Sequence, residues 1–178
     1  YDPHADEALL NRAYVYAMKA HGQQKRASGD PYFSHPLEVA AILTEYELDD
    51  ATIATALLHD TIEDTETTAV ELEAEFGAVV RDIVLEVTDD KLLPKFERKR
   101  LQIEHAAHAS PKAKLVKLAD KICNLRDVAD RPPAQWDLAR RQEYFEWARQ
   151  VIDRLRGIHP ALERAFDAAY AMKPGTGG

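Results

Sequence analysis

Apolar residues recur every three or four positions along most of the chain, which is the spacing that places side chains on one face of an α-helix. Near the start, Leu9, Ala13, Tyr16 and Ala20 follow this spacing, and Gly22 is suited to end the helix. Later stretches predict helices that carry residues 36–46, 54–60, 69–88, 95–107, 111–128, 135–156 and 160–172. No segment alternates with the period of a β-strand, so we expect an all-α protein, a single bundle of about eight to ten helices.

Residues that favour helix ends support these boundaries. The predicted caps are Asp49 or Asp50, Thr68 in a capping box with Glu71, and Ser110 before Pro111. Gly77 divides the stretch 69–88 into two segments, and the prolines in 131–133 interrupt the chain. We expect one domain over residues 1–173 and a disordered tail at 174–178.

Composition limits the classes of partner. The chain has 178 residues and a formal net charge of −8, which argues against nucleic acid but not against a small anion bound in a local basic pocket. The single cysteine, Cys123, excludes an internal disulfide framework and suits a reducing compartment. No apolar run approaches the roughly 20 residues of a membrane span, and no secretion signal is recognisable. We therefore expect a cytoplasmic protein without membrane contact; the oligomeric state is left open.

The run His59-Asp60-Thr61-Ile62-Glu63-Asp64 is the strongest functional signal in the chain. It places four ionisable side chains directly after the apolar segment 54–58, and buried charge is costly unless it is paired or binds a metal. His35 upstream and Asp120, within an apolar stretch downstream, would complete a set of two imidazoles and two carboxylates. We predict that His35, His59, Asp60 and Asp120 bind one divalent metal ion.

The donor set limits which ion this is. Imidazoles with carboxylates suit Mn²⁺, Fe²⁺ or Zn²⁺ and do not select a thiolate-bound metal. Taken singly, His35 is equally well a turn residue, and Asp120 an ion-pair partner of Lys117 or Lys121. The four residues together favour the metal.

These residues lie in segments that resemble a known family. RASGDPYFSHP (26–36), ALLHDTIEDT (56–65), VTDD (87–90), LPKFERKR (93–100) and LVKLADK (115–121) stand in the order seen in RelA/SpoT hydrolase domains, which are HD-domain metallophosphohydrolases. The chain is especially similar to small alarmone hydrolases of the Mesh type, over roughly residues 5 to 170. No synthetase region follows, so the resemblance implies hydrolysis alone.

The resemblance implies a substrate, a metal and a catalytic pair. The substrate would be guanosine tetra- or pentaphosphate (ppGpp or pppGpp), which loses pyrophosphate from its 3′ position to give GDP or GTP. The family metal is typically Mn²⁺. Glu63 and Asp64 match the catalytic Glu-Asp pair, about one helical turn after the metal pair, where they could orient or deprotonate a water or protonate the 3′ oxygen.

The resemblance also suggests which residues bind the nucleotide. Six positions match or adjoin family positions in the nucleotide pocket: Lys25, Arg26, Tyr32, Lys95, Asn124 and Tyr144. Arg26 would pack on the purine, since a guanidinium plane stacks on bases. The remaining cations of 98–100 and 112–121 are more typical of a solvated helix face. His4, His21, His105, His108 and His159 receive no role.

Three rival functions stay open. Mesh-type relatives also remove the 2′-phosphate of NADPH, and the same metal and carboxylates would serve both reactions. The segments 26–35 and 87–100 argue against the second rival, a broad HD-type nucleotidase. A sensor that binds an alarmone without cleaving it is disfavoured because His59, Asp60 and Glu63 are all present.

Overall fold

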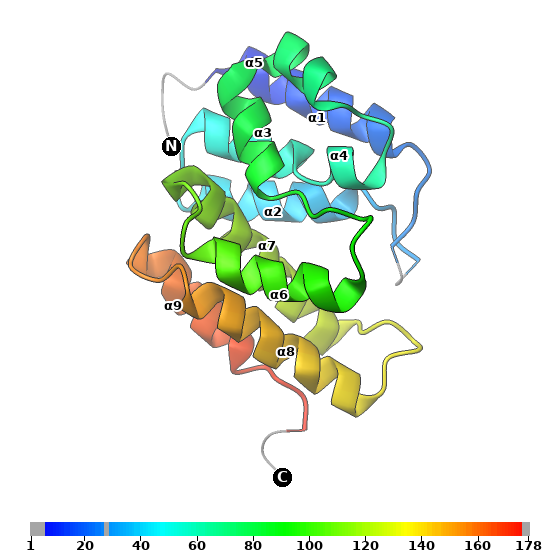
Figure 1. Ribbon diagram of the computed structural model, residues 1–178, viewed down its shortest axis with the longest axis vertical. Coiled ribbons are helices and arrows are strands. Elements are labelled where there is room, and N and C mark those ends of the chain that lie inside the picture. The colour runs from blue at the N-terminus through cyan, green and yellow to red at the C-terminus, as the bar shows by residue number, and fades with distance from the viewer. Residues whose placement is uncertain (1–5, 27–28, 176–178) are drawn as a thin grey trace.

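The computed structural model of the protein describes residues 6–26 and 29–175, and these residues fold into helices without a β-strand (Figure 1). The helices are α1 (Glu7–His21), α2 (Ser34–Glu45), α3 (Asp50–Leu58), α4 (Thr61–Asp64), α5 (Ala69–Glu86), α6 (Lys95–Ala106), α7 (Pro111–Asp130), α8 (Leu138–Asp153) and α9 (Pro160–Tyr170). An isolated bridge between Lys25 and Pro31 closes the loop before α2. The expected all-α bundle is confirmed.

Helix α7 is the centre of the bundle. It packs against α2, α3, α5, α8 and α9, while α1 and α2 pack on α3, and α6 packs on α8. Figure 1 shows α1 to α5 in one half of the molecule and α6, α8 and α9 in the other, with α7 between them. Any side chain on the inner part of α7 therefore lies where the two halves meet.

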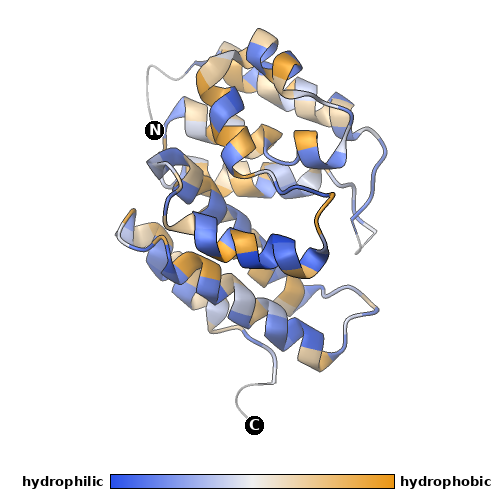
Figure 2. Ribbon diagram, in the orientation of Figure 1, coloured by the Kyte–Doolittle hydropathy of each residue, from blue (hydrophilic) through white to orange (hydrophobic). Residues whose placement is uncertain are grey.

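One apolar core runs through both halves. Its largest fully buried side chains come from several helices: Leu43, Leu58, Leu72, Leu118, Ile122, Phe145, Ile152 and Phe166. On α3, every residue from 52 to 58 is buried, which explains why this stretch carries no charged side chain. Hydrophobic residues accordingly line the inner faces of the helices in Figure 2. Within the described part of the chain, no helix combines the length and the apolar character that crossing a bilayer requires.

The predicted helix starts agree with the observed caps. The side chains of Asp49, Thr68 and Ser110 each accept a hydrogen bond from the backbone N–H three residues later. Glu71 does not close the capping box through a side-chain bond to Thr68; its carboxylate accepts a 2.9 Å hydrogen bond from the Tyr16 hydroxyl instead. Gly77, with φ of 88° and ψ of 170°, kinks α5 where the sequence predicted a division.

Three predicted boundaries are wrong, and one of them is the end of α8, which lies at Asp153 and not near 156. The third helix ends at Leu58, not at Asp60, because the Leu58 carbonyl accepts a hydrogen bond of 2.7 Å from the Thr61 hydroxyl and a new helix starts at Thr61. Helix α8 begins at Leu138 and not near 135, because the Asp137 side chain caps it through Arg140 N–H. In the expected tail, the Pro174 carbonyl accepts a 3.0 Å hydrogen bond from Gln142, and residues 176–178 lie outside the described residues.

Candidate active site

The His59-Asp60 pair sits at the break between two helices. His59 follows the last residue of α3, and Asp60, with φ of −98° and ψ of 0°, precedes the short helix α4. On a continuous helix, neighbouring side chains diverge by about 100°. The break lets both side chains approach the same point, His59 with its ring buried and Asp60 half-buried.

Helices α2 and α7 bring the other two predicted ligands to this point. His35 lies in the first turn of α2, and Asp120 lies in the middle of α7. One ligand atom each of His35, His59 and Asp120 lies within 4.8 Å of the others. Asp60 Oδ2 is 3.1 Å from His59 Nε2 and 4.0 Å from His35 Nε2. The four residues therefore converge, although they come from three separate parts of the sequence.

The hydrogen bonds of His59 suit a bound cation. Its Nδ1 lies 2.6 Å from the Ala56 carbonyl, so Nδ1 carries the proton and donates it. Nε2 is buried and makes no well-aligned hydrogen bond among the described residues, yet carboxylate oxygens of Asp60 and Asp120 lie 3.1 and 3.3 Å away. A neutral imidazole would point a lone pair at two carboxylates, which is unfavourable unless a proton or metal lies between them. The donor set fits a divalent metal ion.

Charge interactions within the cluster shift its protonation equilibria. Burial lowers the pKa of His59, but the Asp60 and Asp120 carboxylates outweigh it and hold the pKa well above the ordinary value. Burial raises the pKa of Asp120, and Lys121 with the two histidines overcomes this and brings that pKa well below its usual range. Without a metal, the cluster therefore holds a proton at His59 and keeps both carboxylates ionised.

Asp120 is also anchored on its far side. Its Oδ2 accepts hydrogen bonds from Lys121 Nζ at 3.2 Å and from Asn124 Nδ2 at 3.3 Å. The Lys121 ammonium in turn lies 4.6 Å from the centre of the Trp147 ring, whose Nε1 donates to the Lys99 carbonyl on α6. These contacts leave Oδ1 directed at the histidines and fix α6, α7 and α8 around the cluster.

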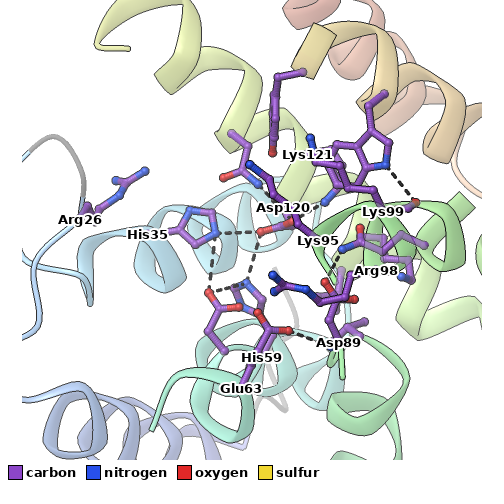
Figure 3. A pocket seen from close by; sticks show the side chains of 18 of the residues that line it. Arg26, His35, His59, Glu63, Asp89, Lys95, Arg98, Lys99, Asp120 and Lys121 are labelled. Carbon is purple, nitrogen blue, oxygen red and sulfur yellow. Dashed lines mark hydrogen bonds and ion pairs between the residues drawn. The ribbon is translucent and has the colours of Figure 1, made fainter. Parts of the chain in front are cut away.

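A cavity of about 440 Å³ opens above the cluster. It is lined by Arg26, Tyr32, His35, His59, Asp60, Glu63, Val87, Asp89, Lys95, Arg98, Lys99, Gln102, Val116, Lys117, Asp120, Lys121, Asn124, Tyr144 and Trp147. The close-up in Figure 3 shows the carboxylates and histidines gathered at one place, with the α6 cations on one side and Arg26 on the other. Such a volume and such a charge distribution suit a phosphorylated small molecule.

The two predicted catalytic carboxylates differ in position. Glu63 lines the cavity, and its Oε1 accepts a 2.7 Å hydrogen bond from the Asp89 backbone N–H. Asp64 does not line the cavity; it accepts a hydrogen bond of 2.5 Å from the Tyr32 hydroxyl and pairs with Lys91 Nζ at 2.7 Å. Burial, with nearby carboxylates, raises the pKa of Glu63 to about 7. Glu63 is thus the carboxylate placed to exchange a proton in the cavity.

Five of the six predicted nucleotide-binding residues line the cavity: Arg26, Tyr32, Lys95, Asn124 and Tyr144. Lys25 is exposed and lies outside it. Arg26 is held by a hydrogen bond to Asp127, by Ser34 Oγ at 3.3 Å and by Glu38 at 3.6 Å. Burial raises the pKa of Tyr144 to about 12, so its hydroxyl keeps its proton.

Sequence reasoning missed several lining residues. Lys117 and Lys121 are buried rather than solvated, and Lys99 lies 5.0 Å from the centre of the Trp147 ring. Asp89 and Gln102 complete the α6 side, joined by a 2.6 Å hydrogen bond. Lys117 lies three residues before Asp120, and Lys121 lies one residue after it. This spacing is the only sequence feature that indicates a position near the cluster for the two lysines.

Comparison with protein families identifies the fold. The sequence profile of the HD domain matches residues 13–145, a stretch that contains all four converging residues. A solved structure described as a metazoan orthologue of SpoT that hydrolyses ppGpp superposes with a TM-score of 0.90 at 43% identity, covering 94% of this chain and 96% of that one.

Proteins with an assigned activity are similar over nearly the whole chain. The guanosine-3′,5′-bis(diphosphate) 3′-pyrophosphohydrolase MESH1 of Xenopus tropicalis is 53% identical over 170 residues, which is 93% of this chain and 95% of the relative. The human MESH1 is 53% identical over 173 residues, and that of Drosophila melanogaster is 45% identical over 162 residues. The alignment with the human protein covers 95% of this chain and 97% of the relative. The alignment with the fly protein covers 89% of this chain and 90% of the relative. The chain therefore belongs to the HD-domain family, in the group formed by the MESH1 proteins.

Proposed function

We propose that this protein is a metal-dependent 3′-pyrophosphohydrolase that converts ppGpp to GDP, or pppGpp to GTP, with release of pyrophosphate. The observation that carries the proposal is the convergence of His35, His59, Asp60 and Asp120 beside a cavity whose other wall is rich in cations. The assigned activity of the MESH1 relatives supports the same reaction. By this reaction the protein would end an alarmone signal.

His35, His59, Asp60 and Asp120 would hold a single ion. Mn²⁺ is our first choice, with Fe²⁺ or Zn²⁺ compatible with the same donors. When bound, the ion would polarise a phosphoryl oxygen and lower the pKa of a coordinated water. The hydrogen bonds of Asp120 to Lys121 and Asn124, and of His59 to Ala56, would orient the ligands toward it.

Glu63 is proposed as the group that moves the proton. The water oxygen would form a bond to the 3′-proximal phosphorus as the bond from that phosphorus to the ribose 3′ oxygen breaks. One proton of the water would pass to the Glu63 carboxylate and then to the 3′ oxygen, which leaves pyrophosphate and the 3′-hydroxyl as products. A pKa of about 7 suits a group that must accept and return a proton near neutral pH.

Asp64 would act through Tyr32. Its carboxylate holds the Tyr32 hydroxyl, which also lies 3.3 Å from Asp60 Oδ2. We propose that Asp64 positions Tyr32 and Asp60 instead of contacting the substrate. Arg26, Asn124 and Tyr144 would bind the nucleoside, and Lys95 a phosphate. Lys25, which is exposed outside the cavity, would contribute only long-range charge.

Two further proposals concern the compartment in which the protein acts and the extent of its domain. A buried free Cys123 suits a reducing cytoplasm, which we propose as the site of action. The apolar core includes residues from Ala13 to Ala169, which supports a single domain over most of residues 1–173.

The test is Mn²⁺-dependent turnover of ppGpp, with products separated by ion-exchange chromatography and NADPH assayed in parallel. We expect GDP and pyrophosphate in equal amounts, loss of activity on chelation and recovery on adding Mn²⁺. His59→Ala should lose both turnover and bound metal, whereas Glu63→Gln should keep metal and lose rate. Release of orthophosphate from NADPH without cleavage of ppGpp would replace the proposal with a 2′-phosphatase.

A further inference from the structure

His21 is a buried polar side chain that takes no part in the proposed chemistry. It is the last residue of α1 and only 2% exposed, and its Nε2 is buried without a polar partner among the described residues. A buried nitrogen without a partner costs free energy that an apolar side chain of similar size would not. Packing alone therefore does not explain an imidazole at this place, and its contacts indicate what it contributes.

Gln24 connects His21 to α4. The Gln24 Nε2 donates a 2.8 Å hydrogen bond to the backbone carbonyl of Asp64, the last residue of α4. This bond fixes the orientation of the amide, so Oε1 faces His21 and accepts from its Nδ1–H over 3.1 Å. The Gln24 backbone N–H donates to the His21 carbonyl at 3.0 Å, and the Gln24 carbonyl accepts from the Tyr32 N–H at 2.8 Å. One residue thereby joins the end of α1, the end of α4 and the loop before α2.

Tyr32 extends these contacts to the predicted metal ligands. The rings of His21 and Tyr32 pack with their centroids 4.8 Å apart and an interplanar angle of 33°. The Tyr32 hydroxyl donates to Asp64 Oδ2 at 2.5 Å and lies 3.3 Å from Asp60 Oδ2, the oxygen that is 3.1 Å from His59 Nε2. A phenol has one proton to donate, and the shorter contact assigns it to Asp64. The lone pairs of the Asp60 oxygen thus stay available to a cation.

We propose that His21 and Gln24 are positioning residues for the metal site. They keep the Tyr32 hydroxyl turned to Asp64 and away from Asp60. If Asp64 moved, the phenol proton would turn to the Asp60 oxygen and compete there with the ion. The pair acts from outside the active-site cavity, since neither His21 nor Gln24 lines it. This inference rests on the metal site of the proposed function.

Calorimetric titration with Mn²⁺ tests the role of Gln24. Gln24→Ala removes both side-chain hydrogen bonds of an exposed residue and should weaken Mn²⁺ binding by roughly 3- to 10-fold, the equivalent of one hydrogen bond. Adding Tyr32→Phe removes the competing proton, so the double variant should bind Mn²⁺ as tightly as Tyr32→Phe alone. Gln23→Ala, at an exposed neighbouring position, is the matched control and should bind as wild type does. An equal loss in both backgrounds, or no loss in either, would overturn the proposal.

Two substitutions test the imidazole itself. His21→Leu should weaken Mn²⁺ binding to a similar extent, yet keep or raise the Tm of the metal-free protein, because the unpartnered buried nitrogen is gone. His21→Asn keeps an N–H donor near the place of Nδ1 and should restore most of the affinity. A His21→Leu variant with wild-type affinity and a lower Tm would show that the imidazole serves packing alone.

Turnover of ppGpp separates this inference from the proposed function. In Gln24→Ala, the Mn²⁺ concentration that gives the half-maximal rate should rise by the same factor as the dissociation constant. A wild-type protein that binds Mn²⁺ but does not cleave ppGpp would reject the proposed function, while the titrations would still decide the roles of His21 and Gln24. A wild-type protein that binds no divalent ion would overturn both.

Discussion

The backbone N–H of Asp89 donates a hydrogen bond of 2.7 Å to Glu63 Oε1, which ties the loop between α5 and α6 to α4. Gln102 on α6 extends this link by donating to the Asp89 carboxylate at 2.6 Å. The Glu63 carboxylate is thereby enclosed beside other acidic groups. Burial, followed by the negative charges of Asp89 and Asp60, raises the pKa of Glu63 to about 7. The hydrogen bond from the Asp89 backbone lowers this pKa, but its effect is smaller than that of burial.

The raised pKa of Glu63 predicts a pH dependence of stability in the metal-free protein. An unfolded glutamate releases its proton near its ordinary value of 4.5, but folded Glu63 retains it up to about 7. Between these values the folded state binds more protons, so the free energy of unfolding falls as pH rises. Urea unfolding in a chelating buffer should show that Glu63→Gln loses less stability than wild type between pH 5 and 8. The difference should be about 1–2 kcal/mol once solvent screening of this half-buried group is allowed for.

Glu66→Gln is the matched control for this experiment. Glu66 is exposed in the segment directly after α4, and its substitution should leave the pH profile parallel to that of wild type. Parallel profiles for wild type and Glu63→Gln would show that Glu63 ionises normally in the folded protein.

Metal binding should release a proton from His59. Because Nδ1 donates to Ala56, a ligand bond must form at Nε2, and the pKa of His59 lies well above its ordinary value in the metal-free site. At pH 7 a cation must therefore displace the Nε2 proton, and its apparent affinity should rise with pH. Calorimetric Mn²⁺ titrations should be run in two buffers of different ionisation enthalpy. The difference between the two binding enthalpies should correspond to the release of about one proton per bound ion.

A histidine away from the cluster provides the comparison for the metal titration. His105→Ala, at the exposed end of α6, should reproduce the wild-type proton release. Identical heats in both buffers would mean that His59 is already neutral before the ion binds.

Gly77 gives a prediction about the fold that is independent of the chemistry. Its φ of 88° and ψ of 170° fall in a region that is essentially reserved for glycine, while no atom lies within 4 Å of the place where a Cβ would be built. Gly77→Ala should thus destabilise the protein by about 1–3 kcal/mol through the backbone alone. Thermal unfolding would measure this, with exposed Glu75→Ala on the same helix expected to stay within about 0.5 kcal/mol. An unchanged Tm for Gly77→Ala would show that the kink relaxes at no cost.

Local signals made much of this structure predictable. Helical periodicity and caps such as Asp49, Thr68 and Ser110 act within a few residues, and they located the helices. The convergence of His35, His59 and Asp120 was also foreseeable, because an apolar helix that carries ionisable groups needs a partner for them. The break after Leu58 was not foreseeable, since it depends on a hydrogen bond from Thr61 that competes with continuation of the helix.

Features decided by tertiary packing were not predictable in the same way. The sequence predicted that Lys117 and Lys121 are solvated, because their burial depends on how the neighbouring helices α6 and α8 pack beside α7. Because Glu63 and Asp64 are adjacent in the sequence, they were predicted to be an equivalent catalytic pair. Neighbouring helical side chains point about 100° apart, so Glu63 faces the cavity and Asp64 faces Tyr32.

The ion pair between Arg26 and Asp127 predicts a residue that acts on binding and not on the chemical step. Asp127 on α7 pairs with the Arg26 guanidinium, which is proposed to contact the nucleoside. In the same network, Arg131 pairs with the Asp30 carboxylate at 3.2 Å. Asp127→Asn should leave Arg26 in several orientations and raise the KM for ppGpp by roughly 3- to 10-fold, with kcat little changed. Asp130→Asn, exposed at the end of the same helix, should leave both parameters as they are. A fall in kcat at constant KM would instead place Asp127 in the stabilisation of the transition state, since an interaction lost only there lowers kcat alone.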